Sequence, residues 1–353
     1  MAAALYVHVP FCRARCAYCD FNTTAGLDHL MPAYATAVCR EIEEAGARWS
    51  DATGSTLYLG GGTPSLLPLP ALEAILTVAR ETFRLPPGAE VTLEANPGTV
   101  SRSYLAAVRC LGVNRLSLGV QSADDEELGM LGRIHSWEDA MEAVAATRAA
   151  GFANLSLDLI YGLPGQSLGR WQRTLEAILE LAPDHLSLYA LSVEAGTPLA
   201  RRIERGELPP PDDDLAAEMA LLAEETLAEA GFFHYEISNW ARLPETAKDF
   251  VGSTSRWWPA EAAGVMSEDV SPFVCRHNLS YWRNGSYLGF GAGASSWTGG
   301  RRWTNVRHPQ AYVDRVDGGH SPVAESEAIP PPLEMGETMM MGLRLAEGVS
   351  PSQ

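Results

Sequence analysis

The sequence predicts an α/β protein with an incomplete (β/α)6 barrel over residues 1–208 and a smaller α+β domain over residues 209–353. The first observation is a strand-then-helix alternation that repeats six times before about residue 191. The second is that the later strands alternate apolar and polar residues. Such alternation builds parallel sheets whose right-handed crossovers curl them towards a barrel. Six units are too few to close the barrel, because a closed one has eight.

The strands are predicted from short apolar runs, and the helices from the segments rich in Ala, Leu and Glu between them. The predicted strands are Leu5–Val9, Thr56–Leu59, Val91–Ala95, Arg115–Val120, Leu155–Ile160 and His185–Leu191. The predicted helices are Met31–Arg48, Leu69–Phe83, Ser101–Leu111, Ser136–Ala150 and Leu168–Leu181. This order defines the carboxyl end of each strand, where the active groups of α/β barrels gather.

One face of the predicted strands is polar, although parallel sheets are rarely exposed to solvent on one side. The polar or small residues on this face are Thr92, Glu94, Asn96, Ser117, Gly119, Gln121, Ser156, Asp158, Ser187 and Tyr189. The alternate positions are mostly Leu and Val, and we expect them to pack against the helices. A dry interior would leave hydroxyls and carboxylates without partners. We therefore expect the barrel to hold a polar ligand and water.

The second predicted domain begins with a linker. Pro209–Pro211 is followed by Asp212–Asp214, and acidic residues suit the N-terminus of a helix. An amphipathic helix is predicted at Leu215–Gly231, and short aromatic-rich segments follow from about Phe232. We expect an inserted loop near residues 241–274.

Composition limits the classes of partner and compartment. The 353 residues are 46% hydrophobic, which is enough for a well-buried core. A net charge of −18 argues against nucleic acid and anionic membranes as partners. No segment reaches the length of a membrane span, and Met1–Tyr6 lacks the features of a signal peptide. Six cysteines are too few for a disulfide framework, so we expect a cytoplasmic protein, with Cys39 and Cys110 as core thiols in predicted helices.

Three closely spaced cysteines follow the first predicted strand. Cys12, Cys16 and Cys19 could hold three corners of a [4Fe–4S] cluster, leaving one iron open to a small chelating ligand. The main alternative is a structural zinc site, whose fourth ligand would be His8 or Cys39. Cysteines that cluster without binding a metal are the other alternative, whereas a disulfide would leave one of the three unpaired.

Glycines and charged residues stand at the ends of other strands. The turn Gly60–Pro64 follows the second strand, and its three glycines would let a ligand approach the backbone, although a tight turn alone also explains them. Glu94, Gln121 and Asp158 lie at or near the ends of later strands, and Arg133 follows the fourth. Together these side chains offer donors and acceptors for a charged, hydroxylated cofactor.

In combination these motifs resemble the radical S-adenosylmethionine (SAM) superfamily, in particular its branch of anaerobic coproporphyrinogen III oxidases and HemW-type heme chaperones. The resemblance rests on Tyr6–Cys12 with the two following cysteines, Leu59–Pro64, Gly119–Gln121, Asp158–Pro164 and His277–Trp282. It implies a partial TIM-like barrel, a [4Fe–4S] cluster on the cysteine triad and SAM on the open iron. The residues implied to line one or two SAM sites are Tyr6, Tyr18, Gly61, Gly62, Thr63, Glu94, Gln121, Arg133, Asp158 and Ala190.

Two features depart from the oxidase pattern and resemble the HemW type. The oxidase pattern continues to a fourth cysteine where this sequence has Phe21, and it has a longer segment before the position of Tyr6. Relatives also continue beyond the position of Gln353, so either a C-terminal part is absent here or the family boundary is shorter in this branch. The resemblance implies a heme-trafficking chaperone. The alternatives are an oxygen-independent coproporphyrinogen III oxidase, which converts propionates to vinyls, and a radical SAM methyltransferase, so catalysis itself is left open.

The resemblance also associates a C-terminal motif with heme. Its residues are His277, Asn278, Tyr281 and Trp282. A histidine among aromatics can ligate a porphyrin iron, but a packed histidine is the simpler interpretation of the motif taken alone. Cys275 is a second possible iron ligand that is more simply explained as an inert thiol. The implied partners are heme or a porphyrin, an electron donor such as flavodoxin or ferredoxin, and a heme-accepting protein.

Overall fold

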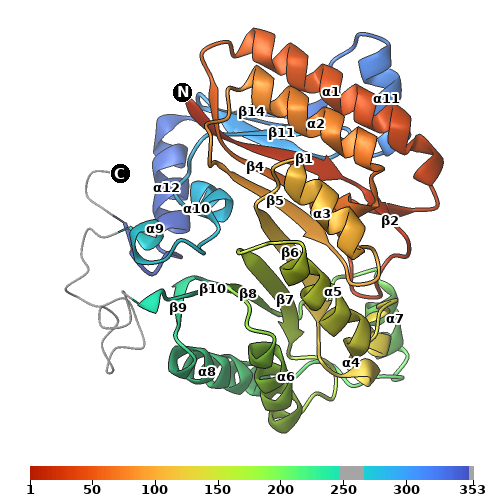
Figure 1. The fold of residues 1–353 in the computed structure, drawn as a ribbon, viewed down its shortest axis with the longest axis vertical. Helices are drawn as coiled ribbons and strands as arrows, with labels where there is room; N and C mark the ends of the chain where they lie inside the picture. The colour runs from red at the N-terminus through yellow and green to blue at the C-terminus, as the bar shows by residue number, and fades with distance from the viewer. Residues whose placement is uncertain (246–265, 350–353) are drawn as a thin grey trace.

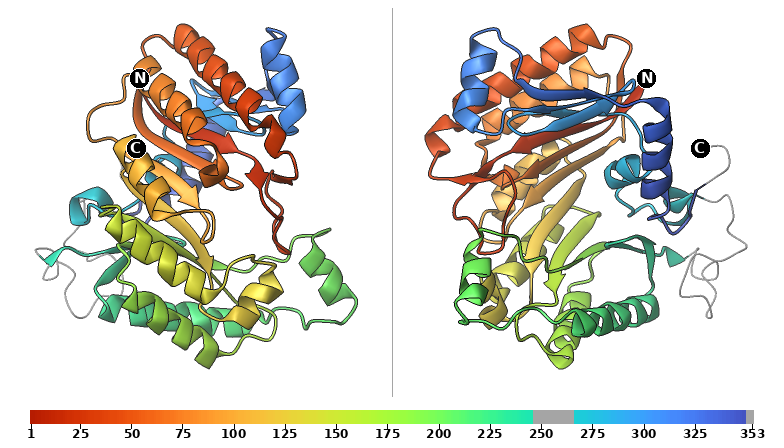
Figure 2. Two further views of the ribbon diagram at one scale, coloured as in Figure 1. Left: turned by 45° about the vertical axis from the view of Figure 1, so that its right-hand side comes forward. Right: turned by 180° about the vertical axis from the view of Figure 1, so that it is seen from behind.

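A computed structural model describes residues 1–245 and 266–349 of the protein. A curved sheet runs through the molecule, and helices cover its outer side (Figures 1 and 2). The insertion expected near residues 241–274 falls largely on residues 246–265, which lie outside the described residues.

Six parallel strands form the barrel wall, in the order in which they occur along the chain. They are β1 (Ala2–Val9), β4 (Thr53–Gly61), β5 (Glu90–Ala95), β6 (Arg115–Gln121), β7 (Leu155–Tyr161) and β8 (His185–Ala190). Each predicted strand is confirmed, with ends that differ by a few residues. The apolar positions Leu93, Leu118 and Leu157 are fully buried against the helices. The polar positions face the barrel interior, where Thr92, Ser117 and Ser156 are among those also removed from solvent.

The predicted helices are confirmed on the outer side of this sheet. They are α1 (Met31–Arg48), α2 (Leu69–Thr82), α3 (Arg102–Cys110), α5 (Trp137–Ala149) and α6 (Leu168–Glu180). Local signals explain several starts, since Ser101 and Ser136 accept hydrogen bonds from backbone amides of the first turn. The short helix α4 (Asp125–Leu131) was not predicted. Asp124 caps its N-terminus, since its carboxylate accepts hydrogen bonds from two amides of the first turn.

Segments after residue 208 extend the same sheet at both edges. Strands β9 and β10 continue antiparallel from β8, whereas β11 pairs in parallel with β1 and leads to three further strands. The division predicted after residue 208 therefore does not separate two sheets. The remaining strands are β2 (Phe11–Cys12), β3 (Thr24–Ala25), β9 (Phe232–Glu236), β10 (Asn239–Arg242), β11 (Tyr287–Phe290), β12 (Ser295–Thr298), β13 (Arg301–Asn305) and β14 (Val323–Ala328). The remaining α-helices are α7 (Pro198–Glu204), α8 (Asp213–Glu229), α9 (Ser267–Val270), α10 (Arg276–Trp282), α11 (Pro309–Asp317) and α12 (Pro331–Gly342).

The cysteines outside the triad differ in burial. Cys275 is buried and Cys39 is partly buried against the core. Cys110 is exposed, so its prediction as a core thiol is wrong. It ends α3, whose buried face is formed by Leu105 and Val108, and two residues of helix rotation turn Cys110 away from that face. Within the described ranges, no helix is both long and apolar enough to cross a membrane.

A carboxylate joins α1 to the C-terminal strands. Glu41 accepts hydrogen bonds from the Gly291 amide (2.8 Å), the Asn305 side-chain amide (2.7 Å) and the Tyr312 hydroxyl (2.6 Å). Burial raises the pKa of Glu41 to about 7, and these donors limit the rise. Three elements far apart in the sequence therefore meet on one side chain.

We expect Glu41→Gln to lower the free energy of unfolding by about 1–3 kcal/mol, because one amide cannot accept from all three donors. This decrease in the free energy of unfolding should become smaller as the pH rises from about 5 to about 8. A carboxyl whose pKa is raised by folding stabilises the folded state less as it ionises, and the glutamine lacks this change. Urea unfolding of both proteins across this range measures the difference. A loss that grows with pH would contradict the raised pKa.

Candidate functional site

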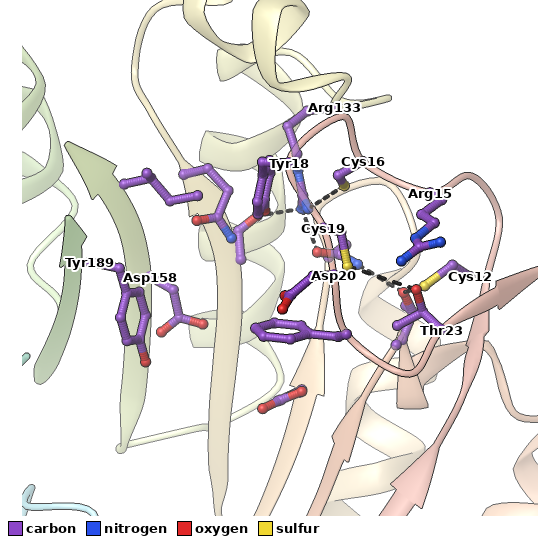
Figure 3. Close-up of a pocket in the computed structure, with 18 of the residues that line it drawn as sticks. Cys12, Arg15, Cys16, Tyr18, Cys19, Asp20, Thr23, Arg133, Asp158 and Tyr189 are labelled. Atoms are coloured by element: carbon purple, nitrogen blue, oxygen red, sulfur yellow. Dashed lines mark hydrogen bonds between the residues drawn. The ribbon is translucent and has the colours of Figure 1, made fainter. Parts of the chain in front are cut away.

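A cavity of about 550 Å³ opens at the carboxyl ends of the barrel strands (Figure 3). One wall is the loop between β2 and β3, and the opposite wall is formed by β7 and β8. The predicted site residues that line it are Cys12, Cys16, Cys19, Tyr18, Gly61, Gly62, Thr63, Glu94, Gln121, Arg133, Asp158 and Ala190. The structure thus brings together residues that are spread over most of the predicted barrel.

The cysteine loop is held in place through its backbone and through Asn22. The Ala17 amide donates to Leu131 O (2.9 Å), and the Ala17 carbonyl accepts from the Leu199 amide at the start of α7 (2.8 Å). The Asn22 side chain donates to the carbonyls of Ala292 (2.9 Å) and Arg307 (3.0 Å). Parts of the chain from both halves of the sequence therefore fix the loop that carries the thiols.

Each thiol of the triad has a different polar neighbour. Thr63 donates its hydroxyl to Cys12 Sγ (3.7 Å), and Arg133 donates Nη1 to Cys16 Sγ (3.3 Å). Cys19 Sγ lies 3.8 Å from the Thr23 hydroxyl. Such donors stabilise thiolates, which are the form of cysteine that binds metals. Burial raises the pKa of Cys12, and the hydrogen bond from Thr63 opposes that rise.

The donor set fits a cluster better than a single zinc ion. Among the described residues, no three His, Cys, Asp or Glu side chains converge on one ion position. His8 cannot complete a zinc site in this arrangement, because its ring nitrogens bond the Tyr6 hydroxyl (2.9 Å) and the Asn22 carbonyl (2.9 Å). Three thiols around one cavity suit a cluster, which takes each ligand at a different iron. When bound, a [4Fe–4S] cluster supplies one-electron chemistry and an iron without a protein ligand.

The glycine turn after β4 keeps this space open. A Cβ atom on Gly62 would lie 2.9 Å from Cys12 Sγ and 2.7 Å from the Phe11 carbonyl oxygen. Gly61 has a φ of +117°, which side chains rarely adopt, and its amide donates to Glu94 Oε2 (3.0 Å). The glycines are therefore required both by the backbone conformation and by the close approach of the cysteine loop.

Two carboxylates form the inner part of the cavity. Glu94 Oε1 accepts from the Tyr58 hydroxyl (2.7 Å), and burial raises the pKa of Glu94 to about 7. Asp158 accepts from Ser117 (3.0 Å) and more weakly from Ser156 (3.4 Å). Burial also raises the pKa of Asp158, while the serine hydrogen bonds oppose the rise. Both groups can accept hydrogen bonds from a hydroxylated ligand.

Arg133 links the carboxylate side of the cavity to the cysteine loop. Besides its contact with Cys16, its guanidinium donates to Asn96 Oδ1 and to the Gly119 carbonyl (2.7 Å). Its Nε is buried without a hydrogen-bond partner among the described residues. Gln121, at the end of β6, has a φ of +73°, a strained conformation that often marks functional sites.

One predicted cofactor residue lies elsewhere. Tyr6 does not line the cavity, because its ring packs beneath the cavity with Tyr58 and His277 and its hydroxyl bonds His8. Side chains that line the cavity but were not predicted as site residues include Arg15, Asp20, Ser192 and Glu194. They follow the ends of β1 and β8, and position after a barrel strand is the signal that could have identified them.

The heme-associated motif forms α10, away from the cavity lining. His277 is 1% exposed, its Nδ1 bonds the Thr56 hydroxyl (2.8 Å) and its Nε2 bonds the Tyr281 hydroxyl (3.0 Å). Its ring stacks on Tyr58 with centroids 4.9 Å apart. Burial lowers the pKa of His277 to about 3, so the ring is neutral at pH 7. Neither ring nitrogen is free to bind iron in this conformation.

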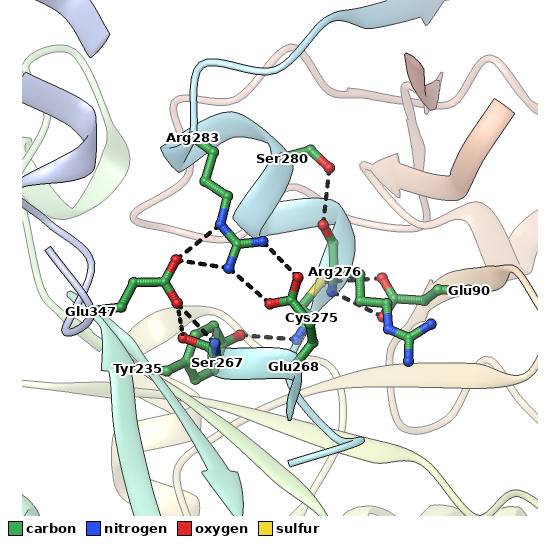
Figure 4. A network of polar contacts seen from close by, with 9 residues as sticks. All are labelled: Glu90, Tyr235, Ser267, Glu268, Cys275, Arg276, Ser280, Arg283 and Glu347. Atoms are coloured by element: carbon green, nitrogen blue, oxygen red, sulfur yellow. Dashed lines mark hydrogen bonds and ion pairs between the residues drawn. The ribbon is translucent and has the colours of Figure 1, made fainter. Parts of the chain in front are cut away.

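Glu90 holds the start of α10 (Figure 4). Its carboxylate accepts from the backbone amides of Arg276 (3.0 Å) and His277 (3.0 Å) and lies 3.7 Å from Cys275 Sγ. Burial raises the pKa of Cys275 to about 12, which favours an inert thiol over an iron ligand. Trp282 lies outside this group, with the Arg344 guanidinium 5.6 Å from its ring. Asn278 lies in α10 and is only partly buried.

The chain is similar to proteins of one known superfamily. The model of the radical SAM superfamily matches residues 6–178. The protein named heme chaperone HemW from Mycobacterium tuberculosis H37Rv is 40% identical over 348 residues, covering 98% of this chain and 82% of that protein. The protein of the same name from Synechocystis is 36% identical, covering 100% of this chain and 80% of that protein.

The fold has a counterpart among solved structures. Coproporphyrinogen III oxidase (HemN) from Escherichia coli, described as a radical SAM enzyme, aligns with a TM-score of 0.81 at 24% identity. The alignment covers 97% of this chain and 75% of that structure, which shows that the two share a fold. The chain therefore belongs to the radical SAM superfamily and, within it, to the family of the HemW proteins.

Proposed function

We propose that this protein is a heme-trafficking chaperone that carries a [4Fe–4S] cluster on Cys12, Cys16 and Cys19. The observation that carries the proposal is the near full-length similarity to proteins named heme chaperone HemW. The placement of all three thiols on one cavity supports the cluster. Heme would be the cargo, passed to an accepting protein.

The same cavity offers a site for SAM. The Arg133 guanidinium suits a carboxylate, and Glu94 and Asp158 suit ribose hydroxyls. The open iron of the cluster would take the amino and carboxylate groups of the methionine part. Gly61, Gly62 and Thr63 leave room for the ligand beside the cysteine loop.

The position of Phe21 supports a chaperone over the oxidase. Where the oxidase pattern continues to another cysteine, this chain has a phenylalanine that lines the cavity and is 64% exposed. The anaerobically reconstituted protein should bind about one heme per chain and leave coproporphyrinogen III unchanged. Formation of protoporphyrinogen together with 5′-deoxyadenosine would instead establish the oxidase, and release of S-adenosylhomocysteine a methyltransferase.

The buried state of His277 sets a condition on heme ligation by the α10 motif. If Nε2 of His277 is to bind iron, its hydrogen bond to Tyr281 must break. If Nδ1 is to bind iron, the hydrogen bond to Thr56 must break. A neutral imidazole is the form that ligates iron, and the lowered pKa keeps His277 in that form. We therefore propose that His277 ligates heme only after α10 moves.

Replacement of any one triad cysteine by alanine should abolish the cluster while the barrel stays folded. The matched control is Cys110→Ala, because this thiol is exposed and does not line the cavity. Iron and sulfide content after anaerobic reconstitution measures the cluster, and circular dichroism measures the fold. Full iron content in any one of Cys12→Ala, Cys16→Ala or Cys19→Ala would rule out the assigned ligands.

The affinity for SAM should rise several-fold between about pH 6 and about pH 8, because the raised pKa of Glu94 leaves its carboxyl partly protonated at the lower value. The ionised carboxylate of Glu94 accepts hydrogen bonds from ligand hydroxyls more strongly than the protonated carboxyl does. Calorimetric titration of the oxidised, reconstituted protein provides the affinities. Glu94→Gln should bind SAM more weakly and lose most of this pH dependence. An unchanged profile in that variant would exclude Glu94 as its cause.

Tyr281→Phe should speed heme binding several-fold, since it removes the hydroxyl that occupies Nε2 of His277 and keeps the ring. His277→Ala should weaken heme binding by about tenfold or more. Tyr287→Phe is the control, because this ring contacts Tyr281 with centroids 4.7 Å apart and is not bonded to His277. Stopped-flow absorbance in the Soret region measures all four proteins. Equal affinities of His277→Ala and the wild type would disprove ligation by His277.

A further inference from the structure

The short helix α4 lies between two residues of the proposed SAM site. Gln121 ends β6 before this helix, and Arg133 follows the helix after Gly132. Both side chains line the cavity, so their positions depend on how α4 is held. Gln121 also has the strained φ of +73°, which contacts outside its own strand must maintain.

A buried carboxylate joins α4 to the loop that follows β7. Glu127, in the first turn of α4, is 1% exposed. Its Oε2 accepts hydrogen bonds from the Ser122 hydroxyl (2.5 Å) and from the Gln166 side-chain amide (3.2 Å). Ser122 comes directly after Gln121, and Gln166 belongs to the loop between β7 and α6. The Gln166 side-chain oxygen in turn accepts from the Leu163 amide (3.2 Å), so the contact reaches the backbone of that loop.

Apolar packing joins the same two segments at the other end of α4. Leu131, the last residue of the helix, packs in one buried cluster with Ile160 of β7 and Leu163 of the loop after it. Tyr18 of the cysteine loop packs against this cluster. Helix α4 is therefore held against the end of β7 by a polar contact near its start and by an apolar contact at its end.

The C-terminal end of α4 contacts the cysteine loop. The Leu131 carbonyl accepts from the Ala17 amide (2.9 Å), and a Cβ atom on Gly132 would lie 3.0 Å from the Ala17 nitrogen. The next residue, Arg133, donates Nη1 to Cys16 Sγ (3.3 Å; Figure 3). A displacement of α4 would therefore move both the guanidinium and the loop that carries the thiols.

The carboxylate of Glu127 is costly for the fold. Its Oε1 is buried and has no hydrogen-bond partner among the described residues. Burial raises the pKa of Glu127, and the hydrogen bonds from Ser122 and Gln166 oppose the rise. At such positions, well-packed apolar side chains of similar volume are often neutral or stabilising. Stability alone therefore does not account for this carboxylate, whereas the placement of the segments that it joins does.

We propose that Glu127 is a positioning residue of the SAM site. It fixes α4 against the loop after β7, and α4 in turn holds Arg133 and the cysteine loop in place. This inference rests on the proposed function, since it requires that SAM binds in this cavity. Glu127 does not line the cavity, so it acts only through the segments that it joins. One carboxylate oxygen bridges two loops, which an apolar side chain cannot do.

The test compares Glu127→Leu, which removes the acceptor, with Glu127→Gln, which keeps an oxygen for Ser122 and Gln166. Calorimetric titration of the oxidised, reconstituted full chain measures the affinity for SAM. We expect Glu127→Leu to weaken binding about tenfold and Glu127→Gln to stay within about twofold of the wild type. The matched control is Glu126→Leu, the same change at the next position of α4, where the side chain is 78% exposed and the affinity should not change. Wild-type affinity in Glu127→Leu would overturn the proposal.

A second variant keeps the test decisive if Glu127→Leu does not fold. Ser122→Ala removes one donor to the carboxylate and leaves Gln166 in place, and it should weaken SAM binding several-fold. Circular dichroism measures the fold of each variant. Wild-type affinity in the folded Ser122→Ala protein would also overturn the proposal.

A double-mutant cycle tests whether Glu127 acts through Arg133. In an Arg133→Ala background, Glu127→Leu should weaken SAM binding by no more than about threefold, because the side chain that it positions is gone. In a Glu94→Gln background the full decrease of about tenfold should remain, since Glu94 is held by Tyr58 and the Gly61 amide. Equal decreases in the two backgrounds would rule out this route.

Hydrogen exchange of the metal-free protein separates this inference from the proposed function. Because the Ala17 amide donates to α4, peptides covering residues 13–20 should exchange several-fold faster in Glu127→Leu than in the wild type or in Glu126→Leu. Peptides of β1 and β4 should exchange as in the wild type. Faster exchange throughout the barrel would show a general loss of stability and overturn the positioning role. If the wild type does not bind SAM, the proposed SAM site is wrong, and the exchange rates still decide whether Glu127 fixes α4 and the cysteine loop.

Discussion

The structure depends on the hydrogen bonds made by buried polar groups inside the barrel, because apolar side chains do not fill this space. Asp158 and Glu94 stand on the inner face of the sheet, and Arg115 lies below them with only 2% of its surface exposed. Buried charges of this kind are tolerated only when hydrogen bonds or opposite charges compensate for lost hydration. Serine hydroxyls serve Asp158, and Tyr58 with the Gly61 amide serves Glu94. The two carboxylates are thereby held in place before any ligand binds.

Segments from the C-terminal part of the chain complete this interior. Tyr235 of β9 accepts from the Cys275 amide (3.1 Å) and bonds His185 Nε2 (2.8 Å). His185 Nδ1 in turn bonds the Ser156 hydroxyl (2.8 Å), which lies 3.4 Å from Asp158 Oδ1. A chain of polar contacts thus connects the residue before α10 with the floor of the cavity. A second connection runs from Glu94 through Tyr58 to the His277 ring.

These connections relate the two proposed binding functions. The proposed SAM site and α10 lie at different depths of one barrel, and side chains such as Tyr58 connect them although they have no common cavity. A change at either carboxylate can therefore alter the contacts that hold His277. Arg115 Nε and Thr92 Oγ1, on the inner side of the barrel, have no hydrogen-bond partners among the described residues. Ordered water commonly binds such buried polar atoms.

The cysteine loop and the barrel end differ in how they are fixed. Strand ends are held by the ladder of the parallel sheet, whereas the loop depends on contacts with Leu131, Leu199 and Ala292. The thiols therefore take their positions only when the segments around the loop have folded. This explains how the partly exposed Cys16 and Cys19 can take fixed positions beside Cys12, although only Cys12 lies in a strand.

The sequence by itself determined the strand and helix alternation, the cysteine triad and several polar residues at the carboxyl ends of the strands, among them Glu94, Gln121 and Asp158. These features depend on local periodicity and on turn chemistry, which can be read over a few residues. Only the tertiary structure decided that β11 pairs with β1, that Tyr6 packs beneath the cavity and that His277 is buried with both nitrogens bonded. Each of these features depends on contacts between residues that are distant in the sequence. A local sequence pattern does not predict which residues a buried side chain will contact. For the same reason Cys110 was misjudged, because the sequence placed it in a helix but did not tell which face of that helix is covered.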